Sequence, residues 1–416
     1  MERLASEGGS PVRRDRFPEG VTGPEITAED ADAVAEVVRS RNLWRHGGRR
    51  VADLEAAWAA LHGRPAAQVT ASTSGTAAIH LAVGAVDPEP GDEIIVAPIT
   101  DFGSVIPILA QNAIPVFADV DAETFCLDPA AVERAITPRT RAIVAVHLFG
   151  QPCDVRALAQ LARARGLALI EDCAQAPLAD VDGQPMGTFG DFGCFSLQQS
   201  KHITAGEGGL TLAADAGRAS RMRLFADKGW PREGQVRTHL HFGLNYRLTE
   251  MQGAVALAQV PRLAGIVRRR QERAARLDRW LADLPGVRLP RPPAGARSAY
   301  WMYPCLVDPA VLGVDASGFA EAVRAEGVPL ASGYVPPLYT VPALAERRTY
   351  GASGFPFGAP QARPQPAYAP GLCPRAESMA ARLVYVPWSQ GYTDRDVDDL
   401  GRAIGKVARA LAARAG

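Results

Sequence analysis

The feature that most constrains the fold is a regular alternation of short apolar runs with helix-like stretches. The apolar runs, each strand-like, lie at residues 68–71, 93–97, 114–119, 142–147, 168–171, 193–197 and 209–212. The helix-like stretches lie at residues 76–86, 104–111, 129–136 and 155–165. Parallel strands need helical crossovers between them, and strands that are apolar throughout are covered on both faces. The pattern therefore predicts an α/β fold with a mostly parallel sheet, in which the later strands, having less helix between them, depart from simple alternation.

The rest of the chain indicates a second unit. A chain of 416 residues is long enough for two domains at about 150 residues each. A long helical region, 248–284, leads into a proline-containing segment, 289–296. Strand-like 300–307 and helix-like 316–326 and 394–413 follow. We predict a flexible tail over 1–20, a large domain over 21–285 and a smaller C-terminal α/β domain over 286–416.

Two further segments carry expectations of their own. The basic run from Arg268 to Arg270 is interpreted as a solvated face of the long helix. Residues 340–375 are rich in Pro, Gly and Ala and are predicted to form a long loop or insert near the binding site.

Composition excludes several classes of protein. Lys plus Arg and Asp plus Glu are both 45, so no broad basic surface for nucleic acid is expected. No apolar run approaches the roughly 20 residues that span a bilayer, and residues 1–20 lack the apolar core of a secretory signal. We therefore expect a cytoplasmic protein without a membrane partner.

The six cysteines form no CxxC pair and no Cys/His cluster with zinc spacing, so neither a metal site nor a disulfide framework is expected. Cys126, Cys173 and Cys194 lie in apolar contexts and are predicted to be small buried core residues.

Polar residues follow the ends of several predicted strands. Because open parallel sheets bind ligands at the carboxyl ends of their strands, these residues are expected to meet at one rim. They are Ser74-Gly75-Thr76, Asp101-Phe102, His147, Asp172 to Gln175, and Ser196 to Lys201.

Lysine is rare in this chain and therefore informative. Only Lys201, Lys228 and Lys406 occur, and the other 42 basic residues are arginine. A lysine is ordinarily an exposed surface residue. Lys201, however, stands between two buried strands at the predicted rim, where partial desolvation lowers an amine pKa and favours Schiff-base chemistry. We interpret Lys201 as a reactive amine.

Two other rim motifs each allow several interpretations. Asp172 directly follows an apolar strand, and such a carboxylate can bind a ribose hydroxyl, a metal or a heterocyclic cation, or cap the next helix. Ser74-Gly75-Thr76 opens a helix whose amides suit a phosphate, although a plain helix cap explains it equally well. The segment is neither a GxGxxG nor a P-loop motif.

Taken in order, a phosphate-type helix start, an aspartate and a lysine match the aspartate-aminotransferase-like enzymes. From about residue 24 to the C-terminus the chain resembles the DegT/DnrJ/StrS family of sugar and cyclitol aminotransferases. The motifs that carry the resemblance are Ser74-Gly75-Thr76-Ala77, Gly91 to Val96, Val146 to Gly150, Glu171 to Gln175, Gly190 to Ser196 with Lys201, Gly206 to Gly209, and Asn245-Tyr246-Arg247.

The resemblance implies a fold type I transferase that uses pyridoxal 5'-phosphate, and it assigns roles. Lys201 would bind the cofactor covalently and move the proton. Asp172 would pair with the pyridine nitrogen, and Gln175 would lie beside the ring. The phosphate would be bound by Gly75, Thr76 and Ser196, and Phe102 would stack on the ring. Asn245 would reach the phosphate held by a neighbouring subunit, which implies a homodimer.

Two residues are weaker candidates for the substrate. His147 ends a strand, where a satisfied structural histidine is the commoner case. Lys228 is interpreted equally well as a surface residue or as a group that reaches a substrate phosphate across the dimer.

The implied reaction is transfer of an amino group from L-glutamate or L-glutamine, through the pyridoxamine form of the cofactor, to a ketone on a sugar nucleotide or cyclitol. An Arg-rich chain of this kind is associated with antibiotic or deoxysugar biosynthesis.

One alternative is a dehydratase or lyase of the same fold. The known dehydratases replace the lysine or add an iron–sulfur cluster, whereas lyases such as the aminohydroxybenzoate synthases keep the lysine. A non-catalytic regulatory protein is the other alternative, which the intact Lys201, Asp172 and Ser196 disfavour. The ketone, the donor and the stereochemistry are not determined by the sequence.

Overall fold

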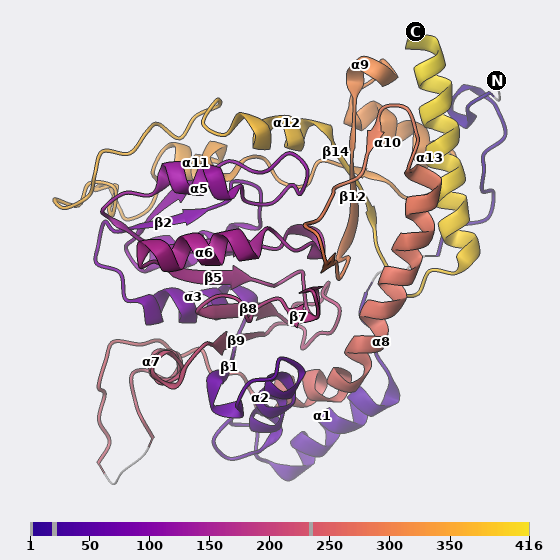
Figure 1. Ribbon diagram of the computed structural model, residues 1–416. Helices are drawn as coiled ribbons and strands as arrows, with labels where there is room; N and C mark the ends of the chain where they lie inside the picture. Colours follow the sequence, from indigo (N-terminus) through magenta and orange to yellow (C-terminus); the bar gives the residue numbers. More distant parts are fainter. Residues whose placement is uncertain (1–2, 19–22, 233–235, 416) are drawn as a thin grey trace.

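A computed structural model describes residues 3–18, 23–232 and 236–415 of the chain. Figure 1 shows a large sheet between helices, and a long helix, α8 (Glu250–Leu281), that runs from this region to a smaller C-terminal unit. The first and last described segments of the chain meet at that smaller unit, where Glu7 pairs with Arg414.

The large sheet has seven strands, and its order places β5 and β8 near the centre. In spatial order the strands are β1 (Val69–Ser72), β9 (Gly209–Ala213), β8 (Phe192–Ser196), β5 (Ala168–Asp172), β4 (Thr140–Val146), β2 (Glu93–Val96) and β3 (Ile114–Phe117). All neighbours pair in parallel except β9, which is antiparallel to both β1 and β8. The predicted mostly parallel sheet is confirmed, and so is its departure from alternation at the later strands.

Local caps fix the helices that follow the strands. Helix α3 (Gly75–Val86) begins directly after β1, where the Ser74 hydroxyl accepts a hydrogen bond from the Ala77 amide at 3.0 Å. Helix α6 (Val155–Arg165) starts after an Asp154 cap and is followed by Gly166, whose φ of 66° is the left-handed conformation that glycine adopts readily. The other helices around this sheet are α4 (Ile106–Ala110), α5 (Pro129–Ala135) and α7 (Ala216–Ala226).

Helices α1 (Ala28–Ser40) and α2 (Arg50–Leu61) pack against α8. The prediction of a solvated Arg268–Arg270 face is wrong for Arg270. The Arg268 side chain is 71% exposed, whereas Arg270 is buried and donates to the carbonyl oxygens of Tyr300 and Trp301. Residues two apart on a helix point about 200° away from each other, so a basic triplet cannot share one face.

The C-terminal unit is built on an antiparallel sheet with its own apolar core. The sheet order is β10 (Val287–Arg288), β12 (Met302–Val307), β14 (Leu383–Pro387) and β13 (Ala331–Ser332). Helices α9 (Pro309–Leu312), α10 (Ala316–Ala325) and α13 (Asp394–Ala415) accompany it. The proline-containing segment 289–296 ends at the first residue of β11, a strand of a separate small sheet. The order of this sheet is β11 (Ala296–Arg297), β6 (Asp180–Val181) and β7 (Gln184–Pro185). The domain boundary at residue 285 stays a prediction.

Residues 3–18, which the sequence indicates as a loose tail, pack on the C-terminal unit. A short turn, η1 (Ala5–Glu7), follows Leu4, which is 1% exposed within the second apolar cluster. Arg13 is buried and pairs with Asp396 at 2.6 Å. These contacts join residues almost 400 positions apart, so the local pattern gives no sign of them.

The proline- and glycine-rich segment 340–375 begins at the end of η5 (Leu338–Thr340), contains α11 (Pro342–Ala345) and reaches the start of α12 (Pro374–Arg382). It packs on the edge of the large sheet rather than at the predicted binding site. Its Gln361 side chain donates to the carbonyl oxygen of Pro90 at 2.5 Å, and the Tyr368 ring packs on Phe117 of the edge strand β3. A covered sheet edge presents fewer free backbone groups for pairing with another chain.

All six cysteines are buried and unpaired with one another, which confirms the core role predicted for Cys126, Cys173 and Cys194. None of the helices in the described ranges has the length and apolar character needed to cross a bilayer. The cytoplasmic location stays a prediction.

Candidate active site

A cleft of about 400 Å³ opens at the carboxyl ends of the central strands. It brings together six of the residues to which the family resemblance assigned a cofactor role, namely Gly75, Thr76, Asp172, Gln175, Ser196 and Lys201. Its other walls include Asp101, Ser104, Glu207, and two aromatic residues of the C-terminal part of the chain, Trp301 and Tyr334. The expected convergence at one rim is therefore observed for these residues.

Lys201 lies in the connection between β8 and β9, where its backbone amide donates to the Gln198 carbonyl oxygen at 2.9 Å. Its Nζ lies 4.1 Å from the centre of the Trp301 ring. Burial lowers the pKa of the Lys201 amine to about 8, although the carboxylates of Asp172 and Asp101 oppose the shift. About a fifth of its population is therefore neutral, and nucleophilic, near pH 7.4, far more than for a lysine of ordinary pKa.

Asp172 ends β5 and is buried at the back of the cleft. Its Oδ2 accepts a hydrogen bond from the Ser104 hydroxyl at 2.7 Å, and its Oδ1 accepts one from the Ala174 amide at 3.0 Å. The hydroxyls of Thr100 and Ser104 are themselves 2.8 Å apart. Burial raises the pKa of Asp172, and the bonds from Ser104 and Ala174 counteract that rise. The carboxylate is thus fixed in place, with its charge available to a cation in the cleft.

The start of α3 and the end of β8 form a narrow cradle. A Cβ atom at position 75 would lie 2.8 Å from the Cβ of Ser196, so only glycine fits there without a shift. The Ser196 hydroxyl accepts a hydrogen bond from the Gln198 amide at 3.2 Å, and Thr76 lines the same wall. A helix start presents free amides and the positive end of the helix dipole, which together suit an anion.

Both polar atoms of the Gln175 side-chain amide are hydrogen-bonded. Its Oε1 accepts from the Phe149 backbone amide at 2.6 Å, and its Nε2 donates to the Tyr334 hydroxyl at 3.2 Å. Burial raises the pKa of Tyr334, so this phenol stays protonated. The pair links the large sheet to the C-terminal part of the chain across the cleft wall.

Phe102 and His147 do not line the cleft. Phe102 begins η3 (Phe102–Ser104) and packs against the large core, while its neighbour Asp101 faces the cleft. His147 is fully buried behind the strands. Its Nδ1 accepts a hydrogen bond from the Cys153 amide, so its Nε2, 3.2 Å from the Glu171 carboxylate, is the donor. His147 therefore has its bonds satisfied by the protein, and the structural interpretation of this residue holds.

Glu171 also accepts hydrogen bonds from three backbone amides, those of Gly187, Phe189 and Gly190. Together with His147 and Cys173 it offers donor atoms within 4.8 Å of one another. We interpret this group as a packed structural network, because each carboxylate oxygen is already hydrogen-bonded within the chain.

Asn245 and Lys228 also lie outside the cleft. Asn245 is exposed and bridges to Asp227 through the backbone, and Lys228 is half-buried with its amide bonded to the Leu244 carbonyl. Both belong to the segment 227–247, called the excursion below. Its two ends meet where Asn245 pairs with Asp227 through the backbone.

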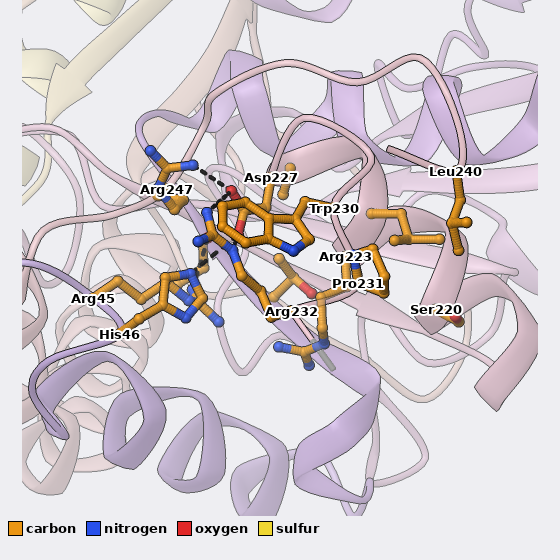
Figure 2. A pocket seen from close by; sticks show the side chains of 14 residues that line it. Arg45, His46, Ser220, Arg223, Asp227, Trp230, Pro231, Arg232, Leu240 and Arg247 are labelled. Atoms are coloured by element: carbon orange, nitrogen blue, oxygen red, sulfur yellow. Dashed lines mark hydrogen bonds and ion pairs between the residues drawn. The ribbon is translucent and has the colours of Figure 1, made fainter. Parts of the chain in front are cut away.

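A second pocket, of about 360 Å³, lies at the base of this excursion (Figure 2). The carboxylate of Asp227 is its centre, and it accepts hydrogen bonds from Arg232 at 2.6 and 2.7 Å and from Arg247. His46 lies 3.0 Å away. Burial opposes ionisation of Asp227, but the two guanidinium groups hold its pKa below the usual range. The cluster anchors both ends of the excursion.

The cleft also contains residues to which sequence reasoning gave no role in the site, among them Asp101, Ser104, Trp301 and Tyr334. Asp101 was noted only as part of a strand-end pair, and Ser104 only as the start of a helix. Trp301 lay within a predicted strand, and Tyr334 in a stretch with no pattern. For Asp101 and Ser104, the one signal in the sequence is their position shortly after a predicted strand. Trp301 and Tyr334 have no such signal.

Comparison with known proteins identifies the family of this chain. The sequence profile of the DegT/DnrJ/EryC1/StrS aminotransferase family matches residues 24–405. The chain belongs to this family. The predicted resemblance, the fold class and the assignment as an aminotransferase are thereby confirmed.

Individual relatives agree with this assignment. The chain is 40% identical over 358 residues to the L-glutamine:2-deoxy-scyllo-inosose aminotransferase of Streptomyces kanamyceticus, covering 81% of this chain and 82% of that one. Among solved structures, the aminotransferase TlmJ of Streptoalloteichus hindustanus is 31% identical with a TM-score of 0.81, covering 94% of this chain and 99% of that one. The structure of 3-amino-5-hydroxybenzoic acid synthase is 27% identical with a TM-score of 0.84, covering 96% and 100%.

Proposed function

We propose that this aminotransferase binds pyridoxal phosphate in the cleft and moves an amino group from L-glutamine or L-glutamate to a ketone on a cyclitol. The observation that carries the proposal is the meeting of a low-pKa amine, a buried carboxylate and an anion-type helix start in one cleft. Each of these groups matches a different part of the cofactor.

The residues present fit the cofactor. The cradle at Gly75, into which no Cβ fits, allows an anion to approach the backbone at the start of α3. The fixed carboxylate of Asp172 suits a protonated ring nitrogen, and the neutral fraction of Lys201 suits attack on a carbonyl carbon. Thr76 and Ser196 would complete the phosphate site, and Gln175 would lie beside the ring.

When bound, the cofactor supplies an electron sink that stabilises negative charge on the substrate carbon. Lys201 would hold or move a proton at its Nζ, a role that its lowered pKa permits. The carboxylate of Asp172, held in place by Ser104, would pair with the protonated ring nitrogen. Trp301 and Tyr334, from the C-terminal part of the chain, close one side of the cleft and limit the access of water.

The lining of the cleft favours a neutral acceptor. Among the described residues that line it, Lys201 is the one cationic side chain, whereas Asp101, Asp172 and Glu207 carry carboxylates. A sugar nucleotide brings a diphosphate, whose negative charges this wall would repel, and a ketone of a cyclitol brings none. The relative that acts on 2-deoxy-scyllo-inosose supports the same choice, with L-glutamine as donor.

We further propose a homodimer in which Asn245 serves the cofactor site of the partner subunit. Support comes from its exposed position outside the chain's own cleft, and from Leu240 and Phe242 on the same excursion, whose side chains are 56% and 74% exposed. Exposed apolar groups that are grouped together are typical of contact surfaces.

The donor half of the reaction is tested first. The protein is loaded with pyridoxal phosphate, and its visible spectrum is recorded before and after L-glutamine or L-glutamate is added without an acceptor. We expect loss of the cofactor's visible band with release of the keto acid. A band that neither donor removes would favour lyase chemistry or another donor, and the absence of any band would refute the role of Lys201.

The acceptor half is then tested with 2-deoxy-scyllo-inosose and, separately, a keto sugar nucleotide, with the amine product detected by mass spectrometry. We expect amination of the cyclitol, whereas amination of the nucleotide alone would overturn the acceptor assignment. Lys201→Ala is the inactive control. Mixed dimers of Lys201→Ala and Asn245→Ala subunits should regain turnover, because one of the two composite sites is then intact.

A further inference from the structure

Trp301 is the aromatic residue that contacts the reactive amine. The Nζ of Lys201 lies 4.1 Å from the centre of the indole ring, well within the range of a cation–π interaction. The indole Nε1 donates to the carbonyl oxygen of Ser200 at 2.9 Å, so the same side chain also fixes the peptide next to Lys201. Trp301 is 7% exposed, which makes this contact a desolvated one.

The protein holds Trp301 in place from several sides. Its amide donates to the Phe149 carbonyl oxygen at 2.8 Å, and its own carbonyl oxygen accepts from the buried guanidinium of Arg270 at 3.2 Å. The same Arg270 atom donates to Tyr300 at 2.9 Å, and Tyr300 adopts a φ of 51°, in the left-handed region that non-glycine residues avoid. Strained backbone persists only where the surroundings determine it, so the placement of Trp301 is strongly specified.

We propose that Trp301 is a positioning residue for Lys201: its indole face binds the lysine ammonium, and its N–H group anchors the adjoining peptide, so that the amine stays in the cleft whenever it is not bonded to the cofactor. The inference rests on the proposed function, in which Lys201 is bonded to the cofactor and released from it in each half-reaction.

The need for such a residue follows from the groups around the amine. A lysine side chain has four rotatable bonds, and carboxylates attract its ammonium toward different walls of the cleft. The titratable groups that face or adjoin Lys201 are Asp101, Asp172, Glu207, Tyr334 and His202. The indole face adds an attraction with a defined direction, and because it is apolar it does so without adding another charge.

The scarcity of lysine makes a direct experiment possible. Lys201, Lys228 and Lys406 are the only lysines that an amine reagent can acylate, and peptide mass spectrometry can follow each one separately from the α-amino group. The rate of acylation of Lys201 is measured against pH in the full-length protein, both alone and with pyridoxamine phosphate, and it yields the pKa of the free amine. The other two lysines are internal references.

Two variants separate the effect of the aromatic face from that of bulk. Trp301→Phe and Trp301→Leu both lose the bond to Ser200, and both retain an apolar side chain, but only phenylalanine retains a π face. Removing that face removes a stabilisation of the ammonium. We therefore expect the pKa of Lys201 to fall by about 0.4 to 1.5 units in Trp301→Leu and by less in Trp301→Phe.

The turnover number of the loaded enzyme should fall in the same order, with phenylalanine retaining more activity than leucine. A pKa in Trp301→Leu that equals or exceeds the native value would overturn the proposal, as would equal values in the two variants. Far-UV circular dichroism confirms that both variants fold.

Failure of this inference is distinguishable from failure of the proposed function. If the protein binds no cofactor and aminates no ketone, the proposed function is wrong, yet the acylation rates still report whether Trp301 holds the amine. If amination proceeds and the variants leave the amine unchanged, only the positioning role is wrong.

Discussion

The buried carboxylate of Asp172 accepts a hydrogen bond of 2.7 Å from the hydroxyl of Ser104, a residue 68 positions earlier in the chain. Asp172 is the last residue of β5, whereas Ser104 lies in η3, which follows β2, so the bond ties two parts of the cleft wall together.

Substitution of Ser104 by alanine should destabilise the protein by about 1 to 3 kcal/mol, because a buried carboxylate oxygen loses its partner. The same change removes a bond that lowers the pKa of Asp172, so that pKa should rise further and affinity for the cofactor should fall. Denaturant unfolding without cofactor measures the first effect. Ser200→Ala, at an exposed hydroxyl, is the control, and equal losses in both variants would contradict the interpretation.

Substitution of Lys201 by methionine should stabilise the protein at neutral pH. Burial lowers the pKa of the native lysine from 10.5 to about 8, so the unfolded chain binds its proton more tightly than the native state does. The penalty is complete below pH 8 and disappears as the pH rises towards 10.5. The gain in Tm of Lys201→Met should therefore shrink over that interval. Calorimetry at several pH values checks this, with Lys228→Met as the control outside the cleft. A gain independent of pH would contradict it.

Substitution of Arg270 by methionine should cost about 2 to 4 kcal/mol, because the carbonyl oxygens of Tyr300 and Trp301 and the side-chain Oε1 of Gln390 lose their buried partner. Arg268→Met, on the solvent side of the same helix, should change stability by no more than about 0.5 kcal/mol. Urea unfolding of the pair compares the two sites directly. Similar costs at both would mean that the guanidinium of Arg270 contributes nothing specific.

Substitution of His147 by alanine should reduce stability far more than catalysis. The change leaves the Glu171 carboxylate and the Cys153 amide each without one buried partner, at a cost of about 1 to 3 kcal/mol per group. We expect kcat of the folded, cofactor-loaded variant to stay within a fewfold of native. A variant of native stability whose turnover is lost would instead show that His147 acts on the substrate.

Much of the cofactor side of the site could be predicted from sequence because it depends on local order. Strand ends of a parallel sheet meet at one rim, so Gly75, Asp172, Ser196 and Lys201 could be placed together before the fold was seen. Phe102 was expected at the cleft, but the sequence does not show which of two neighbouring residues faces it. A turn after a strand decides which of two neighbours faces the cleft, and here it is Asp101.

The sequence by itself determined the strands and helices of the large sheet, since hydrophobic period and helix caps act over a few residues. Only the tertiary structure decided which side of α8 is buried, where residues 3–18 lie, and that segment 340–375 covers a sheet edge. It also brought Trp301 and Tyr334 to the cleft. These features depend on contacts between residues tens to hundreds of positions apart, and no local pattern records which distant surfaces will meet.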